Sequence, residues 1–351
     1  RSKTDPNTSL SCYTQSMSHS KPRGMHYVKD KDLVWRRVKS GDGFRYINRL
    51  GRPIKKNAIE RVKALVIPPA WEDVHISPDP NGHIQATGLD DKGRKQYIYH
   101  PAWIEFNQQH KFDSLKKFGE ILPTLRETIA AHMRQHDLTR ERILATVVWL
   151  LEHTFIRVGN KEYADENQSY GLTTLRAKHV EMDGSTITFS FKGKSHVYHE
   201  LDIRHPRVAQ TIKECIELPG YQIFKYLDGE KRHAIDSGDV KEYLKEVTGE
   251  PLSAKDFRTW GGTTLAGDTL YKIGSPTEEM TAEKALVKAV AEVAEHLGNT
   301  VAVCRQYYIH PRVIESYEKD KLVSLFDKVH RAKGSTPAGL TWEEYATLSL
   351  L

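Results

Sequence analysis

The residues with the clearest chemical potential lie between Gly298 and Pro311. An apolar-periodic run ends at Gly298, which suits the left-handed residue just past a helix, and Asn299 or the threonine after it can cap a new short helix. Because proline disfavours helical geometry in the residue before it, Tyr307 and Tyr308 fall at the end of that helix. A phenol at a helix end can reach a cleft, although a pair of half-buried tyrosines is more often structural.

Two arginines occur in apolar surroundings, where an unpaired charge is costly. Arg157 closes an apolar helix and Arg258 is flanked by aromatic residues. Each needs an anion, and a neighbouring carboxylate such as Glu152 or Asp256 is the ordinary partner. Together with Lys194 on a tight turn and a tyrosine at a helix end, they form a set that can serve phosphoryl transfer. That chemistry needs a hydroxyl nucleophile, cations to hold the developing charge and an acid for the leaving oxygen.

The composition limits the classes of protein in which these candidate residues can occur. The 351 residues have a net charge of +6, with 38% hydrophobic and 28% charged residues, as expected for a globular chain of about two domains. A moderately basic chain is compatible with a polyanionic partner. Three scattered cysteines favour neither a disulfide framework nor a zinc cluster, and no apolar run reaches the ~18 residues of a membrane helix. We therefore expect a cytoplasmic protein without a metal or a membrane anchor.

The first part of the chain predicts a small β-rich domain. Residues 1–24 are rich in Ser, Thr, Lys and Pro and are expected to form a flexible tail. Residues 25–102 follow as the β-rich domain. Its extended runs, separated by turn residues, are at 33–38, 43–47, 74–76, 83–87 and 95–99, with one helix at about 55–64.

Basic and aromatic residues mark this domain as a candidate nucleic-acid surface, because cations suit phosphates and rings pack on bases. They form two groups: Arg36, Arg37, Lys39, Arg45 and Tyr46, then Lys92, Arg94, Lys95, Gln96, Tyr97 and Tyr99. Strand alternation sends Lys95, Tyr97 and Tyr99 to one face and Gln96 to the other. From composition alone, a solvated sheet face is an equal alternative.

Residues 103–351 predict a larger, mainly helical domain, after a linker near residues 100–110. Apolar residues at helical spacing predict helices at 104–118, 123–136, 139–156, 206–218, 238–248, 254–267, 278–297 and 312–328. Extended runs at 172–180, 186–192 and 197–201 predict a three-stranded antiparallel sheet, with Lys194 at its second turn. The expected fold class is α+β.

Several blocks of this sequence closely resemble the small, poxvirus-like type IB DNA topoisomerases of bacteria and large viruses. The blocks include Arg157-Val-Gly-Asn160, Tyr170-Gly-Leu-Thr-Thr174, Phe191-Lys-Gly-Lys194, Lys255-Asp-Phe-Arg-Thr-Trp-Gly261, Gly93-Arg-Lys-Gln-Tyr-Ile-Tyr-His-Pro101 and the stretch from Asn299 to Pro311. They follow the family's order and extend over about residues 26–330.

The resemblance implies an enzyme that relaxes supercoiled duplex DNA, with its two domains forming a clamp around the DNA. Tyr308 matches the nucleophile, which forms a 3′-phosphotyrosine and leaves a free 5′-hydroxyl. Arg157 and Arg258 match the cations that stabilise the transition state, and Lys194 matches the general acid. Asn299 stands where many relatives carry His, and its amide can still donate to a phosphate oxygen.

The resemblance also implies DNA contacts from Gln96, Tyr97, Tyr99, Tyr163 and Lys255. Because the phosphotyrosine keeps the energy of the broken phosphodiester, resealing needs neither ATP nor a metal, so no cofactor is expected. We expect a monomer that binds duplex DNA and is associated with the nucleoid.

Two other functions remain open at this stage. A tyrosine recombinase or integrase uses the same nucleophile and similar cations, but it usually carries a His-x-x-Arg box where this chain has Asp256-Phe-Arg258. A catalytically silent DNA-binding clamp would lack one of the five site residues, and all five are present. Incubation with supercoiled plasmid, in EDTA and without ATP, separates the three.

Overall fold

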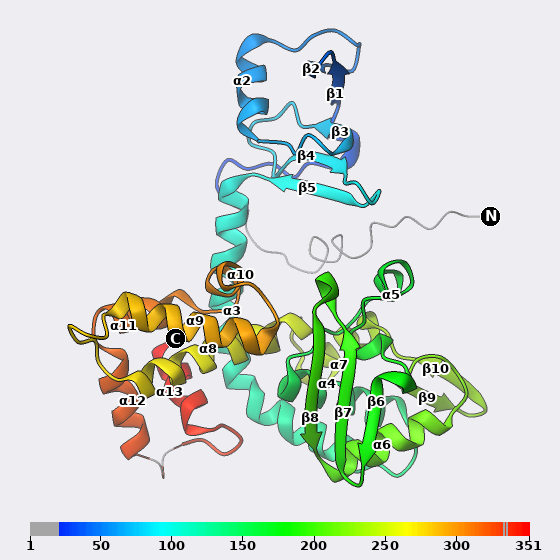
Figure 1. The fold of residues 1–351 in the computed structure, drawn as a ribbon, viewed down its shortest axis with the longest axis vertical. Helices are drawn as coiled ribbons and strands as arrows, with labels where there is room; N and C mark the ends of the chain where they lie inside the picture. Colours follow the sequence, from blue (N-terminus) through cyan, green and yellow to red (C-terminus); the bar gives the residue numbers. More distant parts are fainter. Residues whose placement is uncertain (1–20, 333, 335) are drawn as a thin grey trace. The chain divides into compact units, whose positions relative to one another are not determined.

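The computed structural model describes residues 21–332, 334 and 336–351. Most of the predicted tail therefore lies outside the described residues. The chain divides into two compact units, one ending at Lys111 and one running from Phe112 to Leu351 (Figure 1). Every helix in the described ranges is too short or too polar to cross a membrane.

The first unit is a five-stranded antiparallel sheet with one helix. The strands are β1 (Trp35–Ser40), β2 (Gly43–Ile47), β3 (Glu72–Ile76), β4 (Ile84–Leu89) and β5 (Lys95–Tyr99), in the order β2-β1-β3-β4-β5, with η1 (Asp30–Asp32) before them and α2 (Lys56–Ala64) after β2. Val62 of α2 packs with Val74, Ile76 and Ala86 in a small core. The predicted strands and helix of this β-rich region are confirmed.

A single long helix, α3 (Pro101–His132), follows the sheet. Two predictions were wrong here, because the residues expected to form a linker are helical and Pro123 lies inside the helix instead of starting a new one. Phe112, Leu115, Phe118, Leu122 and other apolar residues are buried at three- or four-residue spacing on both sides of the proline. Burial of this continuous stripe outweighs the backbone hydrogen bond that proline removes.

The second unit is mainly helical. Its helices are α4 (Arg140–Thr154), α5 (Lys161–Asn167), α6 (Pro206–Glu217), α7 (Ser237–Thr248), α8 (Ala254–Ile273), α9 (Ala282–Leu297), α10 (Val301–Tyr307), α11 (Pro311–Glu318), α12 (Leu322–Arg331) and α13 (Trp342–Leu350). Its strands are β6 (Val180–Asp183), β7 (Thr186–Lys192), β8 (Tyr198–Arg204), β9 (Lys225–Asp228) and β10 (Lys231–Ala234), and short 3-10 turns are η2 (Leu172–Thr174), η3 (Ala177–His179) and η4 (Lys194–His196). The predicted antiparallel sheet is present as β6-β7-β8 (Figure 1).

Helix α8 joins the two cores of this unit. Phe257 and Trp260 pack in a core built around α3, α4, α6, α7 and β7. Ala266 and Leu270, further along the helix, pack in a second core with residues of α9 to α13. A side chain on the first half of α8 therefore lies where the two halves of the unit meet.

Three further expectations about this unit were wrong or incomplete. Residues 172–179 form the turns η2 and η3, and a strand begins only at Val180. The helix expected at 312–328 is divided into α11 and α12, with Asp320 in a left-handed conformation between them. Helices α5 and α13 and the β9-β10 hairpin were not predicted.

Candidate active site

Tyr308 directly follows α10, and its main chain is fixed to α8. Thr300 caps the helix by accepting a hydrogen bond from the Val303 N–H, and the Tyr308 N–H donates to the carbonyl of Cys304 at 2.9 Å. The Tyr308 carbonyl accepts from the hydroxyl of Thr263 at 3.3 Å. A Cβ atom on Gly262 would lie 2.8 Å from the same carbonyl, so only glycine allows this approach.

Arg258 is the centre of the site. It is only 4% exposed, and its guanidinium donates to the carbonyls of Phe155, at the end of α4, and of Leu297, at the end of α9. Its Cζ lies 5.2 Å from the centre of the Tyr308 ring. Its buried Nε–H has no hydrogen-bond acceptor among the described residues. The Arg258 side chain thus connects α8 with the ends of α4 and α9. Its Nε–H is still available to donate a hydrogen bond.

Arg157 follows the end of α4, in a segment pinned by the turn η2. The Leu172 N–H donates to the Arg157 carbonyl at 2.9 Å. Gly159 has a φ of +98°, and a Cβ on Gly171 would lie 2.5 Å from both the Arg157 carbonyl and the Gly159 nitrogen. The two glycines therefore let the backbones touch, which explains why this motif needs them on both sides of α5.

Asn299 connects Arg157 to the segment that leads into α10. Gly298 ends α9 in a left-handed conformation, as predicted, and Asn299 follows it. The Asn299 Oδ1 accepts a hydrogen bond from Arg157, which leaves the side-chain amide as a donor. That Nδ2 is buried and has no acceptor among the described residues. A buried donor without a protein acceptor is uncommon, so this amide is well placed to donate to a bound group.

The electrostatics of the cluster favour negative charge on the phenol. Burial alone would raise the pKa of Tyr308, but the charge of Arg258, its hydrogen bond, and the charges of Lys255 and Arg157 outweigh burial and lower it. The pKa of Arg157 is lowered by burial and then by the neighbouring Arg258. Two mutually repelling cations in a half-buried site are stabilised when an anion binds between them.

The two candidate lysines differ in where they lie. Lys255 is half-buried at the start of α8 and is close enough to affect the pKa of Tyr308. Lys194 is exposed on η4, between β7 and β8, as predicted for a turn. Among the described contacts, none joins Lys194 to the arginines or the tyrosine, so the structure gathers four of the five catalytic candidates and leaves the lysine on an adjacent turn.

The DNA-contact candidates of the first unit lie on β5. The Lys95 ammonium is 5.4 Å from the Tyr97 ring centre, and the Tyr97 and Tyr99 rings stack at 5.9 Å. The predicted alternation is confirmed, since Gln96 instead donates to Asp90 at 2.9 Å. Burial raises the pKa of Tyr99 to about 12.

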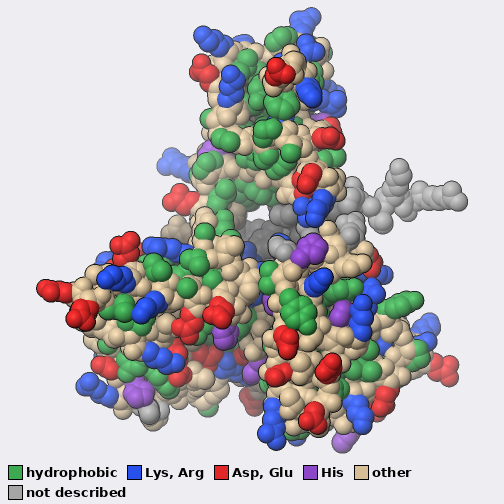
Figure 2. All heavy atoms as spheres, viewed as in Figure 1, with side chains coloured by type: hydrophobic (Ala, Val, Ile, Leu, Met, Phe, Trp, Pro, Cys, Tyr) green, Lys and Arg blue, Asp and Glu red, His purple; other side chains and the backbone are tan. Residues whose placement is uncertain are grey.

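One basic candidate proved to be structural. Arg37 is 9% exposed, and its guanidinium donates to the carbonyls of Ile67 and Pro68 at 3.1 and 3.0 Å. It faces the core because it satisfies carbonyls of a proline-rich loop. Exposed basic residues of β1, β2 and the start of α2 include Arg36, Lys39, Arg45, Lys55 and Lys56. Figure 2 shows basic side chains over the end of the unit that carries these elements. Tyr163 lies in α5, and its side chain is outside the described residues.

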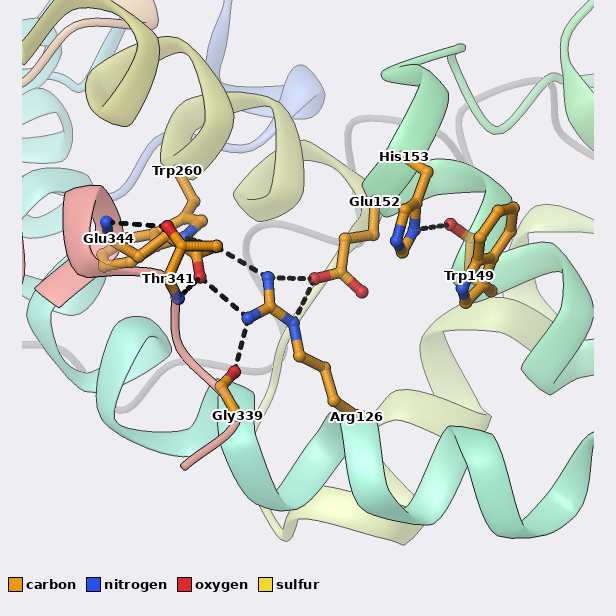
Figure 3. Close-up of polar contacts among 8 residues, drawn as sticks. All are labelled: Arg126, Trp149, Glu152, His153, Trp260, Gly339, Thr341 and Glu344. Carbon is orange, nitrogen blue, oxygen red and sulfur yellow. Dashed lines mark hydrogen bonds and ion pairs between the residues drawn. The ribbon is translucent and has the colours of Figure 1, made fainter. Parts of the chain in front are cut away.

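A polar network that the sequence did not reveal contacts α8 through Trp260. Glu344 of α13 accepts hydrogen bonds from Arg126 at 2.6 and 2.8 Å and from the Trp260 indole at 3.2 Å (Figure 3). Arg126 also pairs with Glu152 at 2.7 Å. Arg126 and Glu152 border a cavity of about 220 Å³ that Tyr308 does not line. Trp260 lies two residues after Arg258, so the network fixes the helix that carries it.

Comparison with known proteins supports the resemblance. Residues 100–334 match the family model "Eukaryotic DNA topoisomerase I, catalytic core", and residues 43–90 match "Bacterial DNA topoisomerase IB, N-terminal domain". The DNA topoisomerase 1B of Acanthamoeba polyphaga mimivirus is 33% identical over 295 residues, covering 81% of this chain and 87% of that protein. The DNA topoisomerase 1B of vaccinia virus (strain Copenhagen) is 24% identical over 244 residues, covering 69% and 74%. These matches do not favour a recombinase or an inactive binder, and the chain belongs to the type IB DNA topoisomerases, enzymes of the isomerase class.

Proposed function

We propose that Tyr308 attacks a backbone phosphate of duplex DNA while Arg157, Arg258 and Asn299 bind that phosphate. The phenol releases its proton to solvent and its oxygen bonds to phosphorus, while the bond to the 5′-oxygen breaks. Lys194 gives that oxygen a proton and regains one from solvent. The products are a 3′-phosphotyrosine and a 5′-hydroxyl, and the reverse step reseals the strand after supercoils have relaxed. The phosphodiester energy stays in the transester, so the proposal needs neither ATP nor a metal.

The observation that carries this proposal is the pair of buried, unpartnered donors beside the phenol. The Arg258 Nε and the Asn299 Nδ2 lack acceptors among the described residues, and the arginines of the site repel each other. A non-bridging phosphate oxygen satisfies such donors and neutralises such cations at once. The lowered pKa of Tyr308 further supports its role as the nucleophile.

Lys194 has a different kind of support. It lies on η4, and an exposed lysine on a turn is free to meet DNA from outside the buried cluster. A general acid acts on the leaving 5′-oxygen, which is on the side of phosphorus opposite the nucleophile. A lysine apart from the tyrosine therefore fits the geometry of an in-line displacement.

The proposed division of labour follows the two parts of the chain. Residues 25–102 would bind one side of the duplex, with Gln96, Tyr97 and Tyr99 as contacts, and residues 103–351 would carry the chemistry and close a clamp. Stacked tyrosines next to a lysine suit a sugar-phosphate surface. Tyr163 and Lys255 are further proposed DNA contacts, with Lys255 near the cleaved bond. We further propose that the enzyme acts as a monomer at the nucleoid.

A single-turnover cleavage assay tests the residue roles. A duplex whose cleaved strand releases a short 3′ fragment traps the covalent complex, which is separated on a denaturing gel in EDTA and without ATP. We expect alanine at position 157, 258 or 299 to slow adduct formation, with the loss at each arginine about 10²-fold or more. Wild-type rates in both arginine variants, or a need for ATP or metal, would overturn the proposal.

A further inference from the structure

A histidine outside the predicted catalytic set separates two turns of the candidate site. His199 lies on β8, opposite Phe191 of β7, and their rings stack at 5.2 Å (Figure 1 shows the two strands). A Cβ atom on Gly193 would lie 2.6 Å from its ring atoms. On the other side, a Cβ on Gly298 would lie 2.7 Å from its Cε1. The imidazole therefore fills the space between two glycines.

Each glycine immediately precedes a candidate catalytic residue. Gly193 precedes Lys194, and Gly298 precedes Asn299. The Gly298 side is rigid, because the N–H groups of Gly298 and Asn299 donate to the carbonyls of Glu295 and Ala294 at 3.1 and 3.0 Å. The Gly193 side is a short turn closed by two bonds, from the Gly193 N–H to the Val197 carbonyl at 2.8 Å and from the His196 N–H to the Gly193 carbonyl at 3.1 Å. The ring contacts both turns.

We propose that His199 is a positioning residue that sets where the Lys194 turn lies relative to Asn299. The proposal rests on the general-acid role proposed for Lys194. It also explains the glycine at position 193, whose φ of −90° is open to any residue. There the absence of a side chain is required by the approach of the ring and not by the backbone conformation.

The charges around the ring suit a packing role. Burial, followed by the charges of Arg157 and Arg258, lowers the pKa of His199. The ring is therefore neutral at pH 7 and adds no third charge to the two arginines. A neutral aromatic ring stacked on Phe191 is a stiff spacer, which a flexible side chain could not replace.

The test uses two forms of the same cleavable duplex, one with the ordinary 5′-oxygen and one with a 5′-bridging sulfur, whose thiolate leaves without an acid. A shift of about 1 Å in a catalytic group can cost roughly 10²-fold. We therefore expect His199→Ala to slow cleavage of the oxygen substrate by about 10- to 100-fold and to leave the sulfur substrate near the wild-type rate. Gly193→Ala, whose new methyl group would push against the ring, should give the same pattern.

A double-mutant cycle with Lys194→Ala separates this proposal from the one on which it rests. If His199 acts through Lys194, adding His199→Ala to Lys194→Ala causes no further loss on the oxygen substrate. Failure of the sulfur substrate to rescue Lys194→Ala itself would overturn the general-acid role, whatever His199 does. Equal losses on both substrates in His199→Ala and Gly193→Ala would overturn the positioning role alone.

His196 provides the matched control on the same turn. Its side chain is exposed and its φ is +59°, which asparagine tolerates. We expect His196→Asn to cleave both substrates within about twofold of wild type. A selective loss on the oxygen substrate in this variant as well would contradict a specific role for His199, because any disturbance of the turn would then suffice.

Discussion

The guanidinium carbon of Arg258 lies 5.2 Å from the centre of the Tyr308 ring, and its hydrogen bond to the phenol helps lower the pKa of Tyr308. Tyr307, the preceding residue, is the last residue of α10. Adjacent side chains on a helix diverge by about 100°. The arginine therefore distinguishes between two neighbouring phenols, and this relationship underlies the first prediction.

Tyr308→Phe should bind duplex DNA normally and form no covalent adduct, whereas Tyr307→Phe should still form one. Arg258 lowers the pKa of the Tyr308 phenol, which makes it the better nucleophile. Peptide mapping by mass spectrometry of an adduct trapped with denaturant identifies the modified tyrosine. A nucleotide found on Tyr307 would refute the assignment and also the register used for Asn299.

Tyr308 should ionise at lower pH than Tyr99. Arg258 and its neighbours lower the pKa of the first phenol, and burial raises the pKa of the second to about 12. A titration followed by NMR of chains labelled at the tyrosine Cζ carbon, with Tyr308→Phe and Tyr99→Phe used for assignment, measures both. In Arg258→Ala, the Tyr308 signal should move to higher pH. An unchanged Tyr308 titration in that variant would show that the arginine does not activate the phenol.

DNA affinity should fall with salt because basic residues displace counterions from the phosphates. Each neutralised phosphate contributes a slope of about −0.9 in log K against log salt concentration. Arg36→Ala should reduce the slope by about one such increment, because this arginine is exposed and makes no described ion pair. Fluorescence anisotropy at several salt concentrations measures the slope.

Two other basic residues test whether a cation that already has a carboxylate partner also contributes to the salt dependence. Lys95 already pairs with Asp30 at 2.6 Å, and Arg176 lies 4.0 Å from Asp165. Ion pairs between exposed side chains contribute little free energy. Lys95 and Arg176 should therefore still exchange their carboxylate partners for DNA phosphates. Arg37→Ala serves as the contrast: its charge faces the core, so it should lower the stability of the first unit instead of the salt slope. A salt-independent affinity in the wild-type protein would exclude the clamp.

Glu344→Gln should destabilise the protein by about 2 to 4 kcal/mol, since Arg126 and Trp260 lose a charged acceptor in a buried site. Urea denaturation measures this change in the free energy of unfolding. Glu315→Gln removes one side of the exposed Glu315–Lys319 pair and should cost less than about 1 kcal/mol. Similar losses in the two variants would argue against a special role for the network in Figure 3.

The same carboxylate gives the network a pH dependence. Burial raises the pKa of Glu344, but hydrogen bonds and charge from Arg126 outweigh burial and lower it. A carboxylate with a lowered pKa in the folded state stabilises the protein above its unfolded pKa. That contribution is lost as the pH falls through the folded value. The stability difference between wild type and Glu344→Gln should therefore shrink in acid.

Local signals predicted much of the fold, and the family resemblance predicted which residues form the candidate site. Gly298 and Pro311 mark the two ends of the segment around Tyr308, because each restricts the backbone in a way that depends only on its own residue type. Strand alternation placed Lys95 and Tyr97 on one face for the same reason. The convergence of Arg157 with Asn299 came from the family resemblance, since no local pattern brings residues 142 positions apart together.

The errors arose where tertiary contacts override local preference. Pro123 continues a helix because the apolar stripe on both sides of it is buried. Leu172 has a strand-like neighbourhood, yet its N–H bonds to Arg157, and the resulting turn replaces the expected strand. Arg37 looks like a surface cation until the carbonyls of Ile67 and Pro68 are known. His199 was missed because its role depends on two glycines far apart in the sequence.

The attachment of both Tyr308 and Arg258 to α8 has a mechanical consequence. The helix carries Arg258 directly, and Thr263, one turn further on, bonds to the Tyr308 carbonyl. In the proposed mechanism, a broken DNA strand that rotates would exert torque on the tyrosine to which it is joined. Because that load would pass into the same helix that carries the arginine, the two side chains would shift together and keep their alignment. The joined end would then stay aligned for the return reaction however many turns the free end makes.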